Sequence, residues 1–126
     1  MIQIILVNEE SRASQYGIGT YIKQLCLILS QKQGIHLSVI CCRSTKNDFY
    51  IERKGDIDYY HIPDTIQNND PEIRIKTYYK NIWYLIFPYF SSHSKENIIL
   101  HINYYQHIHL LNTFRAFFLK DDVALL

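Results

Sequence analysis

Residues 2–42, IQIILVNEESRASQYGIGTYIKQLCLILSQKQGIHLSVICC, decide the fold class of this protein. The stretch opens on a nearly unbroken apolar run at residues 2–7, which is typical of a central parallel strand that is covered on both faces. A polar loop follows, from residue 8 to residue 17. Beyond it, apolar residues recur at the three- and four-residue spacing of a helix, at Ile18, Ile22, Leu25 and Leu29.

Gly34 stands where we expect this helix to stop, because glycine readily adopts the conformation that ends a helix. Residues 37–41 then alternate in the manner of a second strand. A strand, a helix and a strand at this spacing predict a βαβ unit with a right-handed crossover.

The remaining sequence continues the alternation of strands and helices. Residues 49–53 and 57–62 predict two short strands, separated by a turn at residues 54–56. A long helix is predicted from Glu72 to about Phe90, which Pro88 should bend or end. Residues 97–102 predict a third buried strand.

A final helix is predicted with Leu111, Phe114 and Phe118 on one face. After it, residues 123–126 either begin a further strand or are an accident of truncation. The whole order predicts an α/β protein: a Rossmann-like open, mostly parallel sheet with helices on both faces.

Length and composition restrict the function classes. A chain of 126 residues predicts a single core, and 48% hydrophobic with 20% charged residues is an ordinary globular balance. The net charge of +1 creates no strong field, so we expect no nucleic-acid partner. The longest apolar run, residues 82–90, is shorter than the roughly 20 residues of a spanning helix, although it could touch a membrane surface.

Three cysteines, Cys26, Cys41 and Cys42, stand in a chain that starts without a secretory signal pattern. Cys41 and Cys42 are neighbours on a predicted strand, so their side chains should point to opposite faces and could not easily share one metal ion. We therefore expect buried, reduced thiols and a reducing, cytoplasmic location.

Gly17 and Gly19 open the first helix, where glycine lets a ligand approach the backbone and the unpaired N–H groups attract an anion. The alternative is that both glycines serve only a tight turn. The dinucleotide fingerprint GxGxxG is broken by Ile22, and no acidic residue ends the second strand, which argues against NAD. The phosphate-binding pattern GxxxxGK[ST] is absent.

Glu9, Glu10 and Arg12 fall in the predicted loop after the first strand. Charged groups of this kind bind sugar hydroxyls through strong hydrogen bonds. The alternatives are that they pair with one another, or that at least one glutamate is simply solvated.

A second polar segment, residues 101–107, follows the third buried strand. It supplies His101, Asn103 and Gln106, whose imidazole and amide groups can bind hydroxyls or move a proton. As a zinc site, His101, His107 and His109 have no recognisable spacing and no nearby thiolate, so we expect no metal.

The segments NEESRASQYGIGTY at residues 8–21 and LHINYYQH at residues 100–107 together resemble the N-terminal domain of family 4-type GT-B glycosyltransferases, particularly those of gut Bacteroidetes polysaccharide loci. The resemblance implies two Rossmann-like domains that face a cleft. The N-terminal domain then binds a glycan or lipid-linked acceptor, and the C-terminal domain binds a nucleotide-sugar. It also implies sugar transfer with retained configuration in polysaccharide biosynthesis, without metal or cofactor.

By this resemblance, Gly17 and Gly19 face the donor diphosphate. Glu9, Arg12, His101, Asn103 and Gln106 would line the acceptor side. The catalytic groups stay unknown, because the family's donor-sugar histidine and its paired glutamates would lie beyond Leu126. We expect residues 1–126 alone, without the C-terminal donor-binding domain, to be inactive. If the acceptor is carried on lipid, the region of Trp83 could touch the inner membrane face, and the sequence leaves this peripheral contact open.

Two rival interpretations stay open. One is a non-enzymatic, flavodoxin-like domain that binds a partner or a small ligand, although no aspartate closes the first or third strand as in a receiver domain. The other is a truncated relic with no present function.

Overall fold

The computed structural model describes residues 1–9, 17–45, 47–64, 67–90, 97–102, 104–117 and 123–125. Within them the elements follow in the order β1 (Ile2–Glu9), α2 (Gly17–Leu29), β2 (Ile35–Ser44), β3 (Tyr50–Lys54), β4 (Ile57–Pro63), α3 (Pro71–Phe90), β5 (Asn97–His101), the short 3-10 helix η2 (Tyr105–His107), α4 (Ile108–Phe117) and β6 (Val123–Leu125).

The strands form one sheet in the order β3-β4-β2-β1-β5-β6. Every neighbouring pair is parallel except β3 and β4, which form an antiparallel hairpin at one edge. β1 lies at the centre, between β2 and β5, as its continuous apolar sequence predicts. The strand order reverses there, because the chain leaves β1 toward β2 and β4 and later returns on the other side of β1.

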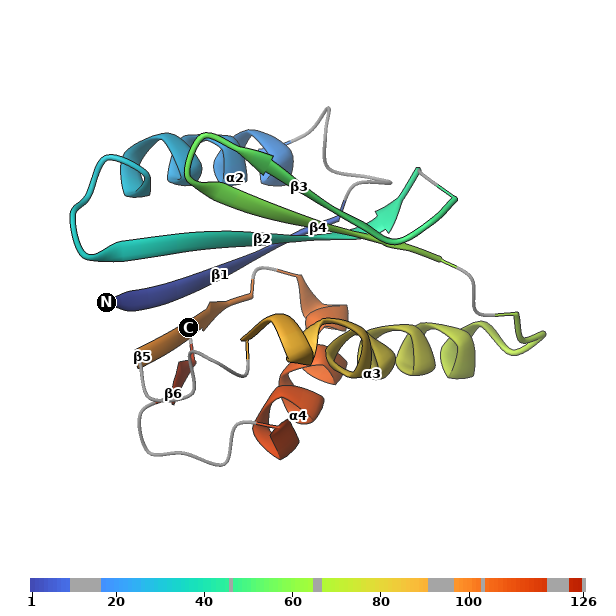
Figure 1. Cartoon of the computed structure of the whole chain (residues 1–126). Coiled ribbons are helices and arrows are strands. Elements are labelled where there is room, and N and C mark those ends of the chain that lie inside the picture. The colour runs from blue at the N-terminus through green and yellow to red at the C-terminus, as the bar shows by residue number, and fades with distance from the viewer. Residues whose placement is uncertain are drawn as a thin grey trace.

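Helices cover both faces of this sheet (Figure 1). On one face, Ile22 and Cys26 of α2 pack with Leu6 and Val39. On the other face, α3 and α4 bury a larger core that includes Tyr79, Trp83 and Phe114 against Ile5 and Ile40. The prediction of a Rossmann-like α/β sheet with helices on both faces is therefore confirmed.

The predicted helix stop at Gly34 is wrong. α2 ends at Leu29, where its apolar stripe gives way to polar residues, and turns follow as far as Gly34. Gly34 has φ +77° and its carbonyl accepts a 2.8 Å hydrogen bond from the Ile2 amide. This glycine therefore shapes the entry into β2, where the left-handed backbone is needed.

The later elements agree with the predicted ones to within a few residues. α3 includes Pro88 and ends two residues after it at Phe90, so the proline lies in the last turn. In α4, Leu110 and Phe114 are fully buried, whereas Leu111 is only partly buried against the core. Phe118, which the sequence predicts on the same face, lies outside the described residues.

β6 pairs in parallel with β5, which confirms the strand alternative for the last residues. All three cysteines are free and buried, as predicted. Cys41 and Cys42 belong to the cores on opposite faces of the sheet, which also confirms the prediction.

No helix in the described part of the chain is long and apolar enough to cross a membrane. Trp83 is fully buried and donates a 2.9 Å hydrogen bond to the Leu110 carbonyl. The tryptophan therefore ties α3 to α4.

Candidate functional site at the carboxyl edge of the sheet

The carboxyl ends of β1, β2 and β5 meet at one edge of the sheet. The parallel register places Glu9 opposite Cys42, and His101 opposite Leu6. In open α/β sheets, ligands bind at this edge where the strand order reverses, which here lies between β1 and β5.

Glu9 is the last residue of β1 and not part of an open loop, which corrects the prediction from the sequence. It is 2% exposed and belongs to the face covered by α3, because it shares the alternation of Ile5 and Val7. Its Oε1 atom accepts hydrogen bonds from the Tyr79 hydroxyl and, at 3.0 Å, from His107 Nε2. Its predicted loop companions, Glu10 and Arg12, lie outside the described residues.

Arg43 directs its side chain toward this carboxylate. It has φ 52° and lies where the register between β2 and β4 shifts. Its amide donates a 2.6 Å hydrogen bond to the Tyr78 hydroxyl, which in turn donates one of 2.7 Å to the Ile62 carbonyl. These bonds hold a conformation that is uncommon for a residue other than glycine. Arg43 Nε then lies 3.9 Å from Glu9 Oε2.

Gln106 connects the buried cluster to the surface. Its Oε1 accepts a 3.2 Å hydrogen bond from the Arg43 guanidinium, and its Nε2 donates one of 3.2 Å to the Tyr105 hydroxyl. Gln106 is 9% exposed whereas Tyr105 is 76% exposed, so a buried amide positions an exposed ring.

Tyr105 and Gln106 border a surface hollow of about 360 Å³, which Glu72, Ile75 and His109 complete. Burial lowers the pKa of His109, and the positive charges of Lys76 and Lys80 lower it further. The imidazole in this hollow is therefore more readily neutral, in a form that can both donate and accept hydrogen bonds.

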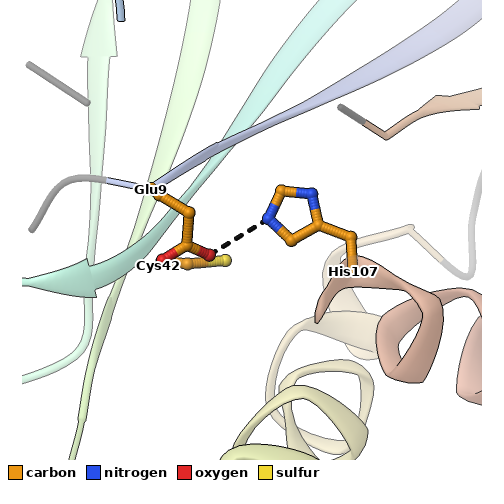
Figure 2. Close-up of side chains that lie close together, drawn as sticks. All are labelled: Glu9, Cys42 and His107. Carbon is orange, nitrogen blue, oxygen red and sulfur yellow. Dashed lines mark hydrogen bonds and ion pairs between the residues drawn. The ribbon is translucent and has the colours of Figure 1, made fainter. Parts of the chain in front are cut away.

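Cys42 and His107 complete the cluster around Glu9 (Figure 2). One ligand atom from each of Glu9, Cys42 and His107 lies within 4.8 Å of the other two, and all three residues are buried. This corrects the statement that the histidines have no nearby thiol: Cys42 is distant in sequence, but the sheet register brings it beside Glu9.

Burial raises the pKa of the Cys42 thiol well above its ordinary value, and the negative charge of Glu9 raises it further. The same two causes raise the pKa of Tyr79, so its hydroxyl stays protonated and donates to Glu9. Three polar atoms of the cluster have no hydrogen-bond partner: Glu9 Oε2, Arg43 Nε and His107 Nδ1. Such atoms are costly to bury, and each needs an explanation.

His101 contacts α2 instead of this cluster. Its Nε2 lies 3.3 Å from the Tyr21 hydroxyl, and the two rings are 5.8 Å apart. Gly17 is the first residue of α2 and Gly19 lies in its first turn, as predicted. Asn103 lies outside the described residues. Of the predicted acceptor residues, the structure therefore brings Glu9 and Gln106 together, through Arg43.

Sequence reasoning missed Cys42, Arg43, Tyr79 and His107 as parts of one cluster. The predicted parallel pairing of the first two strands could have placed Cys42 and Arg43 in this cluster. Parallel pairing aligns the strand ends and brings these two residues beside Glu9. Tyr79 had no such signal, since a tyrosine at helical spacing predicts only a core position.

The fold and its carboxyl edge define a domain of the doubly wound, Rossmann-like class. Neither a protein-family model nor a curated protein matches this sequence.

Proposed function

We propose that this chain is the acceptor-side domain of a two-domain GT-B glycosyltransferase. In that role it binds a glycan or lipid-linked acceptor while a second domain presents a nucleotide-sugar. The observation that supports the proposal most is the path Glu9–Arg43–Gln106–Tyr105, which leads from the strand ends to an exposed aromatic ring.

Tyr105 has the features of a sugar-stacking residue. Its ring is exposed, its hydroxyl is held by Gln106, and the ring of Tyr104 lies 4.8 Å away, centroid to centroid. An aromatic face offers apolar contact to the C–H groups of a sugar ring, while Glu72 and His109 in the same hollow offer hydrogen-bond partners for hydroxyls.

The start of α2 supplies the complementary donor side of the proposal. Gly17 and Gly19 lie in the first turn of a helix of 13 residues, whose unpaired N–H groups favour an anion such as a diphosphate. Tyr21 follows these glycines on α2, and its hydroxyl lies 3.3 Å from Nε2 of His101 at the end of β5. The pair offers a hydroxyl and an imidazole. No metal or organic cofactor is part of the proposed transfer.

The test is a transfer assay with the full reading frame, including any second domain, across a set of nucleotide-sugars and glycan acceptors. We expect transfer, and we expect Tyr105→Ala to weaken acceptor binding, seen as a raised KM for the acceptor. Gly17→Val and Gly19→Val should reduce turnover of the donor. The matched control is Tyr84→Ala, at a tyrosine on α3 that is also exposed but lies outside the hollow.

Absence of any sugar transfer, or transfer that is unchanged in the Tyr105 and glycine variants, would overturn the proposal.

A second candidate function is a binding domain for a small apolar ligand. It is favoured by a cavity of about 300 Å³ beside β4 and α3, lined by Phe49, Ile62, Tyr78 and Leu85 among others.

A further inference from the structure

We propose that Glu9, Cys42 and His107 form a zinc-binding site that ties together the carboxyl ends of β1 and β2 and the helix η2. The three residues come from three separate elements and turn their side chains toward one another (Figure 2). This inference does not depend on the proposed sugar transfer.

The donor set matches the preference of zinc. Thiolate, imidazole and carboxylate groups are its usual protein ligands, whereas calcium and magnesium prefer oxygen alone. Zinc ligands lie about 2.0–2.3 Å from the metal, so tetrahedral ligand atoms are roughly 3.3–3.8 Å apart. The three atoms here, within 4.8 Å of one another, need only small side-chain shifts to reach that arrangement.

The surroundings of the Glu9 carboxylate are the second, independent observation. Both of its hydrogen bonds, from Tyr79 and from His107, reach Oε1. Oε2 is buried and accepts no hydrogen bond, and its ion-pair contact with Arg43 Nε is 3.9 Å long. A zinc ion bound to the carboxylate brings a second positive charge close to it.

Zinc binding releases one proton, from the Cys42 thiol, to the solvent. Zn²⁺ displaces the proton of the Cys42 thiol, and the ring proton on His107 Nε2 moves to Nδ1 as Nε2 becomes the ligand. The thiolate and the Glu9 carboxylate then neutralise the two positive charges of the metal, so the Arg43 guanidinium is left as the one net positive charge of the cluster. Arg43 keeps its hydrogen bond to Gln106 and its 20% exposed side chain.

The Tyr79 hydroxyl already contacts Glu9, so it can remain hydrogen-bonded to a metal-bound carboxylate and orient it. The site is enclosed by protein, with Glu9, Cys42 and His107 all buried. The three residues supply three of the four ligands of a tetrahedral zinc ion, so a water molecule completes the coordination. Because the ligands come from separate elements, zinc binding stabilises the folded state.

The test uses Co²⁺, which replaces zinc and reports a thiolate ligand through an intense near-ultraviolet charge-transfer band. The 126-residue chain is refolded under reducing conditions with one equivalent of Co²⁺, and then titrated with Zn²⁺. We expect the band to appear when Co²⁺ binds and to be lost as zinc displaces cobalt. The Tm of the metal-bound chain should be higher than that of the metal-free chain.

Cys42→Ala should abolish the band, because the thiol is removed while a small apolar side chain stays in the core. Its matched control is Cys41→Ala, the adjacent buried cysteine on the opposite face of the sheet. His107→Gln should weaken Co²⁺ binding, whereas His109→Gln should not. Circular dichroism of each metal-free variant establishes that it is folded.

The proposal is overturned if the wild-type chain shows no charge-transfer band, a result that needs no variant. It is also overturned if the band survives Cys42→Ala or is lost in Cys41→Ala. Neither result bears on sugar transfer, which is measured with the full reading frame and a different readout.

Discussion

At the scale of single residues, Glu9 organises the carboxyl edge. A buried carboxylate is costly unless it is paired and hydrogen-bonded. Glu9 meets that need with donors from Tyr79 and His107 and with the charge of Arg43. The polar residue at the end of a central strand is thereby kept inside the protein, in contact with α3 and η2.

Tyr60 makes the stability of the protein depend on pH in the alkaline range. Burial raises the pKa of its hydroxyl to about 12, with further contributions from Asp58 and Tyr89. Because the folded pKa lies above the ordinary value of 10, the unfolded chain loses this proton first. The contribution of Tyr60 to the free energy of unfolding is fully present below about pH 10. As the pH rises toward 12, this contribution of about 2–3 kcal/mol is lost.

We therefore expect Tyr60→Phe, which keeps the ring, to reduce the loss of unfolding free energy between pH 10 and pH 12. The measurement is urea denaturation at a series of pH values. Tyr84→Phe, at a tyrosine that is 69% exposed, is the control and should follow the wild type. An identical pH dependence for Tyr60→Phe and wild type would show that burial of Tyr60 is not the cause.

At the scale of elements, the contact between α3 and α4 holds the larger core together. The ring of Phe114 lies 5.0 Å from that of Trp83, centroid to centroid, and both side chains are fully buried. The Trp83 hydrogen bond to Leu110 fixes the same pair of helices. Since η2 leads directly into α4, this contact also positions Gln106 and His107.

We expect Phe114→Ala to lower the free energy of unfolding by about 3–5 kcal/mol, because it leaves a cavity beside Trp83. Trp83 is the one tryptophan of the sequence, so its fluorescence reports urea unfolding directly. Ile108→Ala, on the exposed side of the same helix, should change the value by no more than about 0.5 kcal/mol. Equal losses in the two variants would contradict this view of the helix contact.

At the scale of the whole molecule, the sheet has a different kind of edge on each side. The β3–β4 hairpin forms one edge, and the short strand β6 forms the other, paired in parallel with β5. An uncovered strand of a sheet presents unpaired N–H and C=O groups that can pair with another chain.

We expect a chain that ends at Phe117 to associate at high concentration and to melt at a lower temperature, because it exposes the β5 edge. Sedimentation velocity and thermal unfolding, each compared with the full 126 residues, measure the two effects. A truncated chain that stays monomeric with an unchanged Tm would mean that β6 does not protect this edge.

Much of this architecture follows from the sequence alone. The apolar run of β1, the helical spacing of α2 and the later alternation of strands and helices determined the Rossmann-like class, because each pattern reflects which faces of an element are buried. The placement of Cys41 and Cys42 on opposite faces followed from strand geometry in the same way. Local patterns also identified Gly17 as the start of α2 and Gln106 as part of the carboxyl edge.

Only the tertiary structure decided that Glu9 is buried and which residues meet it. Tyr79 approaches from a helix 70 residues away in sequence and His107 from a segment 98 residues away. Local periodicity carries no information on such distances, because it reports the buried face of an element and not the element opposite. The Glu9–Cys42–His107 cluster therefore depends on the register of β1 with β2 and on the packing of α3 and η2 against their ends.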